Sequence, residues 1–163
     1  MRWKMPVGIE DFRELRQGPY YFVDKTEFIC RSLDDHSKVT LFTRPRRFGK
    51  TLTMSMLEWF FSLEKADESG SLFDGLAISG ESAYMQQRGQ YPVLFVSLKD
   101  IRDDTWEMMQ ETFRSTISTW CLHYDYLCHS KKVQTGLKAR LQALEMQQGN
   151  QGEMGLALFQ RPQ

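Results

Sequence analysis

The stretch that decides the fold is KVTLFTRPRRFGKTLTMSML, residues 38–57. It begins with a short β-branched and apolar run, residues 38–43, which predicts a buried strand. A basic loop follows, and residues 50–63 then carry apolar side chains around much of a helical circumference, which predicts a central helix. Residues 92–98 form a second continuous apolar run and predict another strand. Strands separated by helices predict an α/β fold, with flanking helices on a parallel sheet.

The loop between the first strand and its helix resembles a phosphate-binding pattern, G-x-x-x-x-G-K-[ST]. Gly49 allows the backbone to approach phosphate oxygens, and the amides at the helix N-terminus point toward an anion. Lys50 supplies a positive charge for the β- and γ-phosphates, and the Thr51 hydroxyl is an oxygen ligand suited to Mg²⁺. The loop departs from the pattern at its first position, where Arg44 replaces glycine.

The candidate binding set also includes Arg46, Arg47 and Phe48, which lie between the two ends of the loop. The two arginines are either additional phosphate ligands or solvated surface charge, and the sequence leaves both interpretations open. A simpler interpretation of the whole loop is a basic surface turn that caps an ordinary helix.

Composition narrows the class of protein. The chain has 163 residues, 41% of them hydrophobic and 26% charged, which is typical of one globular domain. No apolar run is long enough to cross a membrane, and the N-terminal residues do not have the pattern of a signal peptide. Three cysteines, an odd number, indicate reduced thiols. We therefore expect a cytoplasmic protein with no membrane partner.

Charge is balanced overall but unevenly distributed. Residues 1–50 carry eleven Lys and Arg against seven Asp and Glu, whereas residues 51–100 carry three against seven. The positive excess is greatest at residues 44–50, so an anionic ligand is expected there. This distribution argues against a protein that binds nucleic acid through a uniformly basic surface.

Four further helices are predicted from periodicity and capping signals. They cover residues 9–17, residues 24–35 with Asp24 as N-cap and Glu27 as its capping-box partner, residues 106–120, and residues 131–148.

The cysteines and histidines near residue 125 form a C-x-H-x4-C-H cluster, made of Cys121, His123, Cys128 and His129. It is a candidate zinc site, but its spacing is looser than that of structural zinc sites. Buried thiols and surface histidines are the favoured interpretation.

Four segments together resemble the AAA-ATPase-like proteins of bacteria and archaea. They are YYFVDKTEFI (20–29), LFTRPRRFGKTLTMSML (41–57), LFDGLAI (72–78) and YPVLFVSLKD (91–100). These relatives are P-loop proteins, often fused to a C-terminal PD-(D/E)xK nuclease-like domain. The resemblance implies an incomplete AAA-like P-loop NTPase sheet, with ATP and Mg²⁺ as ligands at a Walker A loop containing Lys50 and Thr51. It also implies an adenine contact at residues 23–26.

The family's Walker B strand, which ends in an acidic motif, has no counterpart before Gln163. The resemblance therefore implies that residues 1–163 are the N-terminal part of a longer protein. Asp100 follows an apolar run and is a candidate replacement acid, although a polar residue that ends the strand is the favoured interpretation. We expect nucleotide binding with little hydrolysis, and DNA contacts only through an absent C-terminal part.

Two alternatives remain open. The first is a non-catalytic remnant or interaction module whose degenerate loop no longer binds nucleotide. The second is a loop that contacts DNA through Arg44, Arg46 and Arg47, in which case binding would weaken steeply with salt.

Overall fold

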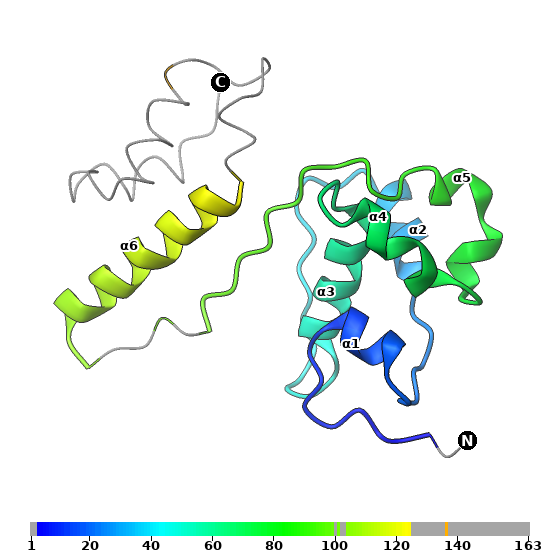
Figure 1. The fold of residues 1–163 in the computed structure, drawn as a ribbon, viewed down its shortest axis with the longest axis horizontal. Coiled ribbons are helices and arrows are strands. Elements are labelled where there is room, and N and C mark those ends of the chain that lie inside the picture. The colour runs from blue at the N-terminus through cyan, green and yellow to red at the C-terminus, as the bar shows by residue number, and fades with distance from the viewer. Residues whose placement is uncertain (1–2, 100, 102–103, 125–135, 137–163) are drawn as a thin grey trace. The chain divides into compact units, whose positions relative to one another are not determined.

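The computed structural model describes residues 3–99, 101, 104–124 and 136 (Figure 1). The chain divides into two compact units, Met1–Val96 and Ser97–Gln163. In its described residues the first unit is helical, with α1 (Phe12–Gln17), α2 (Glu27–Asp34), α3 (Lys50–Phe61), α4 (Ala66–Ser69), the 3₁₀ helices η1 (Gly70–Phe73) and η2 (Ala77–Gly80), and α5 (Ser82–Met85). The second unit contains α6 (Trp106–His123). Among the described helices none is both long and apolar enough to cross a membrane.

The predicted α/β fold with a parallel sheet is wrong for the part of the chain that the structure describes. Residues 38–43 and 92–98, the two predicted strands, contain no strand there. The described residues form two isolated bridges, Lys4 with Tyr20 and Ser62 with Tyr91, and no β-ladder. A buried parallel strand needs paired neighbours and cover on both faces. Neither segment pairs with a described strand, and Val39 and Leu41 are 85% and 82% exposed.

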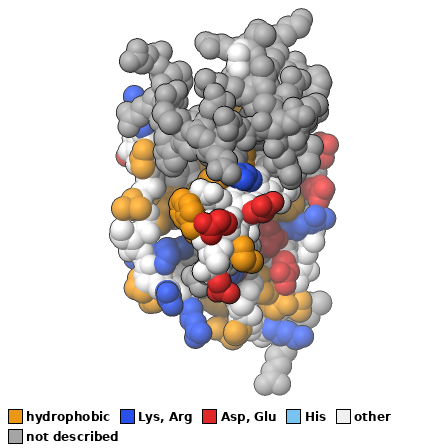
Figure 2. Space-filling model, turned by 90° about the vertical axis from the view of Figure 1, so that its left-hand side faces the viewer, with side chains coloured by type: hydrophobic (Ala, Val, Ile, Leu, Met, Phe, Trp, Pro, Cys, Tyr) orange, Lys and Arg blue, Asp and Glu red, His pale blue; other side chains and the backbone are white. Residues whose placement is uncertain are grey.

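On the face drawn in Figure 2, hydrophobic side chains lie among Lys, Arg, Asp and Glu. Residues 38–43 and 92–98 are apolar in composition, but neither segment has a neighbouring strand to pair with among the described residues.

The core of the first unit forms around α3, which confirms the helix predicted at residues 50–63, although it ends at Phe61. Phe60 from α3, Phe12 from α1 and Phe73 from η1 are fully buried. The Phe73 ring lies 5.1 Å from that of Phe12 and 5.2 Å from that of Phe60, measured between centroids. Three aromatic rings in contact therefore join three short elements that have little stability alone.

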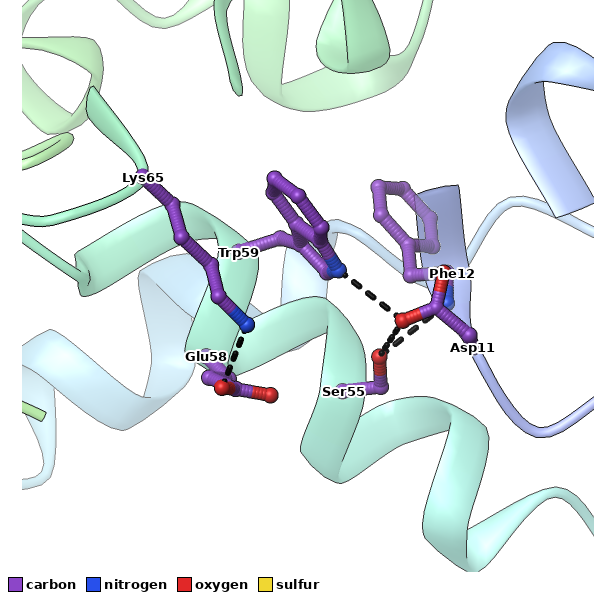
Figure 3. A network of polar contacts seen from close by, with 6 residues as sticks. All are labelled: Asp11, Phe12, Ser55, Glu58, Trp59 and Lys65. Carbon is purple, nitrogen blue, oxygen red and sulfur yellow. Dashed lines mark hydrogen bonds and ion pairs between the residues drawn. The ribbon is translucent and has the colours of Figure 1, made fainter. Parts of the chain in front are cut away.

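Polar contacts add a second connection between α1 and α3 (Figure 3). Asp11 is the N-cap of α1, and one of its oxygens accepts a hydrogen bond from the Glu14 amide at 2.8 Å. Its other oxygen accepts hydrogen bonds from the Ser55 hydroxyl at 3.2 Å and from the Trp59 indole N–H at 3.1 Å. The Ser55 hydroxyl oxygen in turn accepts a hydrogen bond from the Phe12 amide at 3.0 Å. One carboxylate thus fixes the start of α1 against the middle of α3.

This network predicts a measurable cost for Asp11→Ala. The change removes an N-cap and leaves the Trp59 N–H without its acceptor, so we expect a loss of about 2–3 kcal/mol in the free energy of unfolding at pH 7. Urea unfolding followed by tryptophan fluorescence measures it. Asp35→Ala is the matched control, since Asp35 is exposed. A cost equal to that of the control would contradict the role given to Asp11.

The same residue predicts how stability depends on pH. Burial acts to raise the pKa of Asp11, but the hydrogen bonds from Glu14, Trp59 and Ser55 and the charge of Lys65 outweigh it, so the pKa is lowered. Since the folded-state pKa lies below the unfolded one, this stabilisation is fully present above pH about 4 and is lost as the pH falls through the folded-state value. The difference between wild type and Asp11→Ala should therefore shrink in strong acid.

The amphipathic helix predicted at residues 106–120 is confirmed as α6 in the second unit. Ile117 is buried, and Met109, Phe113 and Trp120 are partly buried, in keeping with the predicted stripe. Trp106 departs from it, with 63% of its surface exposed, because it begins the helix. The helix predicted at residues 131–148 lies almost wholly outside the described residues.

Candidate phosphate-binding loop and its cavity

The loop of residues 44–49 reaches α3 through two residues with left-handed backbone, Arg47 at φ 67° and Gly49 at φ 73°. Gly49 is the N-cap of α3 and has no side chain, so no side-chain acceptor satisfies the first amides of the helix. Beyond its chain neighbours, a Cβ atom at Gly49 would meet the Nζ of Lys25, at 3.8 Å. Backbone conformation, rather than lack of space, therefore requires glycine here.

Lys50 is the first residue of α3, and its side chain turns back over the loop. Its ammonium group donates to the Arg44 carbonyl and, at 2.9 Å, to the Pro45 carbonyl. An ammonium group has three N–H donors, so one is left for another acceptor. Lys50 thus closes the loop and keeps a charged donor beside the uncapped helix end.

A cavity of about 460 Å³ adjoins this loop. Four cationic, two acidic and three aromatic residues and one threonine line it: Lys25, Arg31, Arg44, Lys50, Asp24, Glu27, Phe28, Phe42, Phe48 and Thr53. The rings of Phe28 and Phe42 are in contact, with centroids 5.0 Å apart. The cavity therefore combines an apolar wall with an excess of positive charge.

Both acidic residues of the cavity are already engaged. Glu27 forms an ion pair with Arg31 at 3.4 Å. The predicted capping box is wrong, because α2 begins at Glu27 with Thr26, and not Asp24, as its N-cap. Asp24 accepts hydrogen bonds from the Thr26 amide at 2.8 Å, the Thr26 hydroxyl at 2.7 Å and the Ala77 amide at 2.7 Å. Burial acts to raise the pKa of Asp24, but these bonds and the charge of Arg16 lower it, so the carboxylate stays ionised.

The structure brings together only part of the predicted site. Lys50 and Phe48 line the cavity, as does Arg44 at the start of the loop, whereas Arg46 and Thr51 are exposed and are not among its lining residues. Arg47, in the same turn, is also exposed and outside the lining.

Sequence reasoning missed much of the cavity wall, which comes from α2 and the segment before it. The VDKT segment, residues 23–26, gave a signal for Asp24 and Lys25 through the family resemblance. No local pattern marked Phe28, Arg31 or Phe42 as lining residues.

Other candidate groups gain no support. Asp100, Cys128 and His129 lie outside the described residues, and among those described no cluster of three or more His, Cys, Asp or Glu side chains is placed to hold a metal ion. Burial and the nearby Glu81 raise the pKa of the Cys30 thiol, which disfavours the nucleophilic thiolate.

Comparison with known proteins shows which family this chain is related to. No solved structure matches it. An uncharacterized protein from the vnfD 5′ region of Azotobacter chroococcum is 35% identical over 97 residues, covering 59% of this chain and 17% of that protein. The chain thus matches less than a fifth of that relative's length. Residues 6–154 match the family described as "Predicted AAA-ATPase". Because that match covers most of the sequence, the chain belongs to the predicted AAA-ATPase family.

Proposed function

We propose that this chain binds ATP with Mg²⁺ at residues 44–51 and the adjoining cavity. The observation that carries the proposal is the position of Lys50, whose ammonium group lies over the loop beside an uncapped helix N-terminus. Unsatisfied amides and a lysine are the groups that bind nucleotide phosphates at such a loop. Membership of a predicted ATPase family supports nucleotide as the ligand class.

The donor set at the loop fits a polyphosphate. Lys25, Arg44 and Lys50 line the cavity without an acidic partner among the described residues, since Arg31 is the cation that pairs with Glu27. Phe28, Phe42 and Phe48 provide an apolar surface suited to a planar base. In this proposal Arg46 and Arg47 assist from the exposed turn.

The groups present also fit Mg²⁺ bound together with the phosphates. Mg²⁺ keeps several waters and takes only one or two protein oxygens when phosphates supply the others. The exposed Thr51 hydroxyl, in the first turn of α3, would be that protein ligand. When bound, the ion neutralises phosphate charge.

We further propose that hydrolysis by this chain is slow. Phosphoryl transfer to water needs a group that positions the attacking water. Of the two carboxylates of the described cavity, Asp24 is held by three hydrogen bonds and Glu27 is an exposed side chain paired with Arg31, so neither is fixed toward an attacking water.

Titration of the 163-residue chain with ATP, ADP, AMP and adenosine, each with Mg²⁺, tests the proposal. We expect affinity to rise with each added phosphate, because each brings further charge to the loop. Intrinsic fluorescence or calorimetry reports binding. Equal affinity for adenosine and ATP would contradict phosphate recognition. Failure of all four ligands, together with salt-dependent binding of duplex DNA, would replace this proposal with a DNA-binding loop.

A further inference from the structure

We propose that Lys25, which lies outside the loop motif, is a second lysine that binds the nucleotide phosphates in addition to Lys50. This inference rests on the proposed nucleotide binding and names a residue that the loop pattern does not contain. Three observations about the described residues carry it: the position of its ammonium group, its anchoring, and its lack of a protein partner.

The ammonium group of Lys25 lies at the phosphate loop. Apart from Gly49 and its two chain neighbours, its Nζ is the one described heavy atom within 4 Å of the position that a Cβ would occupy at Gly49, at a distance of 3.8 Å. Gly49 is the N-cap of α3, where the unsatisfied amides of the helix begin. Lys25 and Lys50 also line the same cavity. A phosphate group bound to the N-terminus of α3 would therefore lie close to both lysines.

The backbone that carries Lys25 is held in place on both sides. Its neighbour Asp24 accepts a hydrogen bond from the Ala77 amide at 2.7 Å, and its other neighbour, Thr26, accepts one from the Ile78 amide at 3.1 Å. Thr26 is fully buried. Both flanking side chains are thus bonded to η2, and the lysine between them is exposed and extends toward the loop. A fixed backbone lowers the entropy lost when such a side chain binds a ligand.

Lys25 makes no ion pair or hydrogen bond through its side chain with any described residue. The Asp24 carboxylate beside it is occupied by three hydrogen bonds, and Glu27 pairs with Arg31. Lys50, by contrast, already uses two of its donors on loop carbonyls. All three N–H donors of the Lys25 ammonium group are therefore available, and a phosphate can bind to it without breaking a contact within the protein.

The test compares Lys25→Ala, Lys25→Arg and the control Lys38→Ala, which removes an exposed lysine outside the cavity lining. Fluorescent ATP and AMP are titrated against each chain in the presence of Mg²⁺. We expect Lys25→Ala to weaken ATP binding about tenfold or more and to change AMP binding less. Lys25→Arg should recover most of the ATP affinity, and Lys38→Ala should behave as wild type. ATP affinity unchanged in Lys25→Ala would overturn the inference.

Two further measurements separate this inference from a structural effect and from the proposed function. The thermal midpoint without nucleotide should be the same for Lys25→Ala and wild type, and a large drop would assign Lys25 a structural role and overturn the inference. Suppose that wild type binds ATP, that Lys50→Ala loses binding, and that Lys25→Ala binds ATP as wild type does. The proposed function then stands and this inference fails. If wild type itself does not bind ATP, the proposed function and this inference fail together.

Discussion

Lys50→Ala is expected to weaken ATP binding by about 1.5–3 kcal/mol, or about tenfold to a hundredfold, because it removes a charge-assisted hydrogen bond to the phosphates. The variant also loses the two bonds from the ammonium group to the Arg44 and Pro45 carbonyls, which hold the loop over the helix end. Both effects act in the same direction. Titration with a fluorescent ATP analogue and Mg²⁺ measures the change.

Two comparisons make this result specific. Lys38→Ala removes the same charge from an exposed position outside the cavity lining, so its ATP affinity should match that of wild type. The thermal midpoint of Lys50→Ala without nucleotide should fall little, because the loop carbonyls that lose the lysine can bond to water. Equal ATP affinity in Lys50→Ala and wild type would show that the loop is not the phosphate site.

Gly89→Ala is expected to have the largest effect on stability, a loss of about 2–4 kcal/mol. Gly89 is buried, has a φ of 66°, and donates its amide to the Phe60 carbonyl at the C-terminus of α3 at 2.8 Å. An added Cβ would lie 2.6 Å from the Ala66 Cβ and 3.1 Å from the Ala66 Cα. Left-handed backbone and overlap with α4 therefore both oppose the substitution.

Gly75→Ala is the matched control for Gly89→Ala. Gly75 has a similar φ of 72°, but a Cβ there would meet no atom within 4 Å. Its loss should be about 1–2 kcal/mol, from backbone strain alone. The difference between the two variants in urea unfolding therefore measures the overlap with Ala66. Equal losses in the two variants would show that the segment around residue 89 moves away from Ala66 at little cost, and would contradict close packing at Gly89.

Helices were predictable from the sequence because their signals are local. The apolar circumference of residues 50–63 predicted α3, and the stripe at residues 106–120 predicted α6, both of which the structure contains. Strands were not predictable in the same way. The β-branched composition of residues 38–43 indicates a strand only when another strand is placed beside it, and pairing is a property of the whole fold.

The candidate site was predictable to the same limited extent. The loop motif identified Lys50 and Gly49 because their roles depend on neighbours in sequence. It did not identify the cavity wall from α2, since those residues lie outside the motif and meet the loop only in the folded chain. Asp24 became interpretable only when its bond to the Ala77 amide was known, because an acidic residue before a helix otherwise predicts a simple N-cap.

The bonds from η2 to Asp24 and Thr26 have a consequence for motion. They join residues that lie 53 and 52 positions apart in the chain. Local opening of either segment would break both bonds, so opening of η2 and release of the segment around Lys25 are coupled. We therefore expect η2 and the segment around Lys25 to open as one cooperative unit, which hydrogen exchange at the Ala77 and Ile78 amides would report.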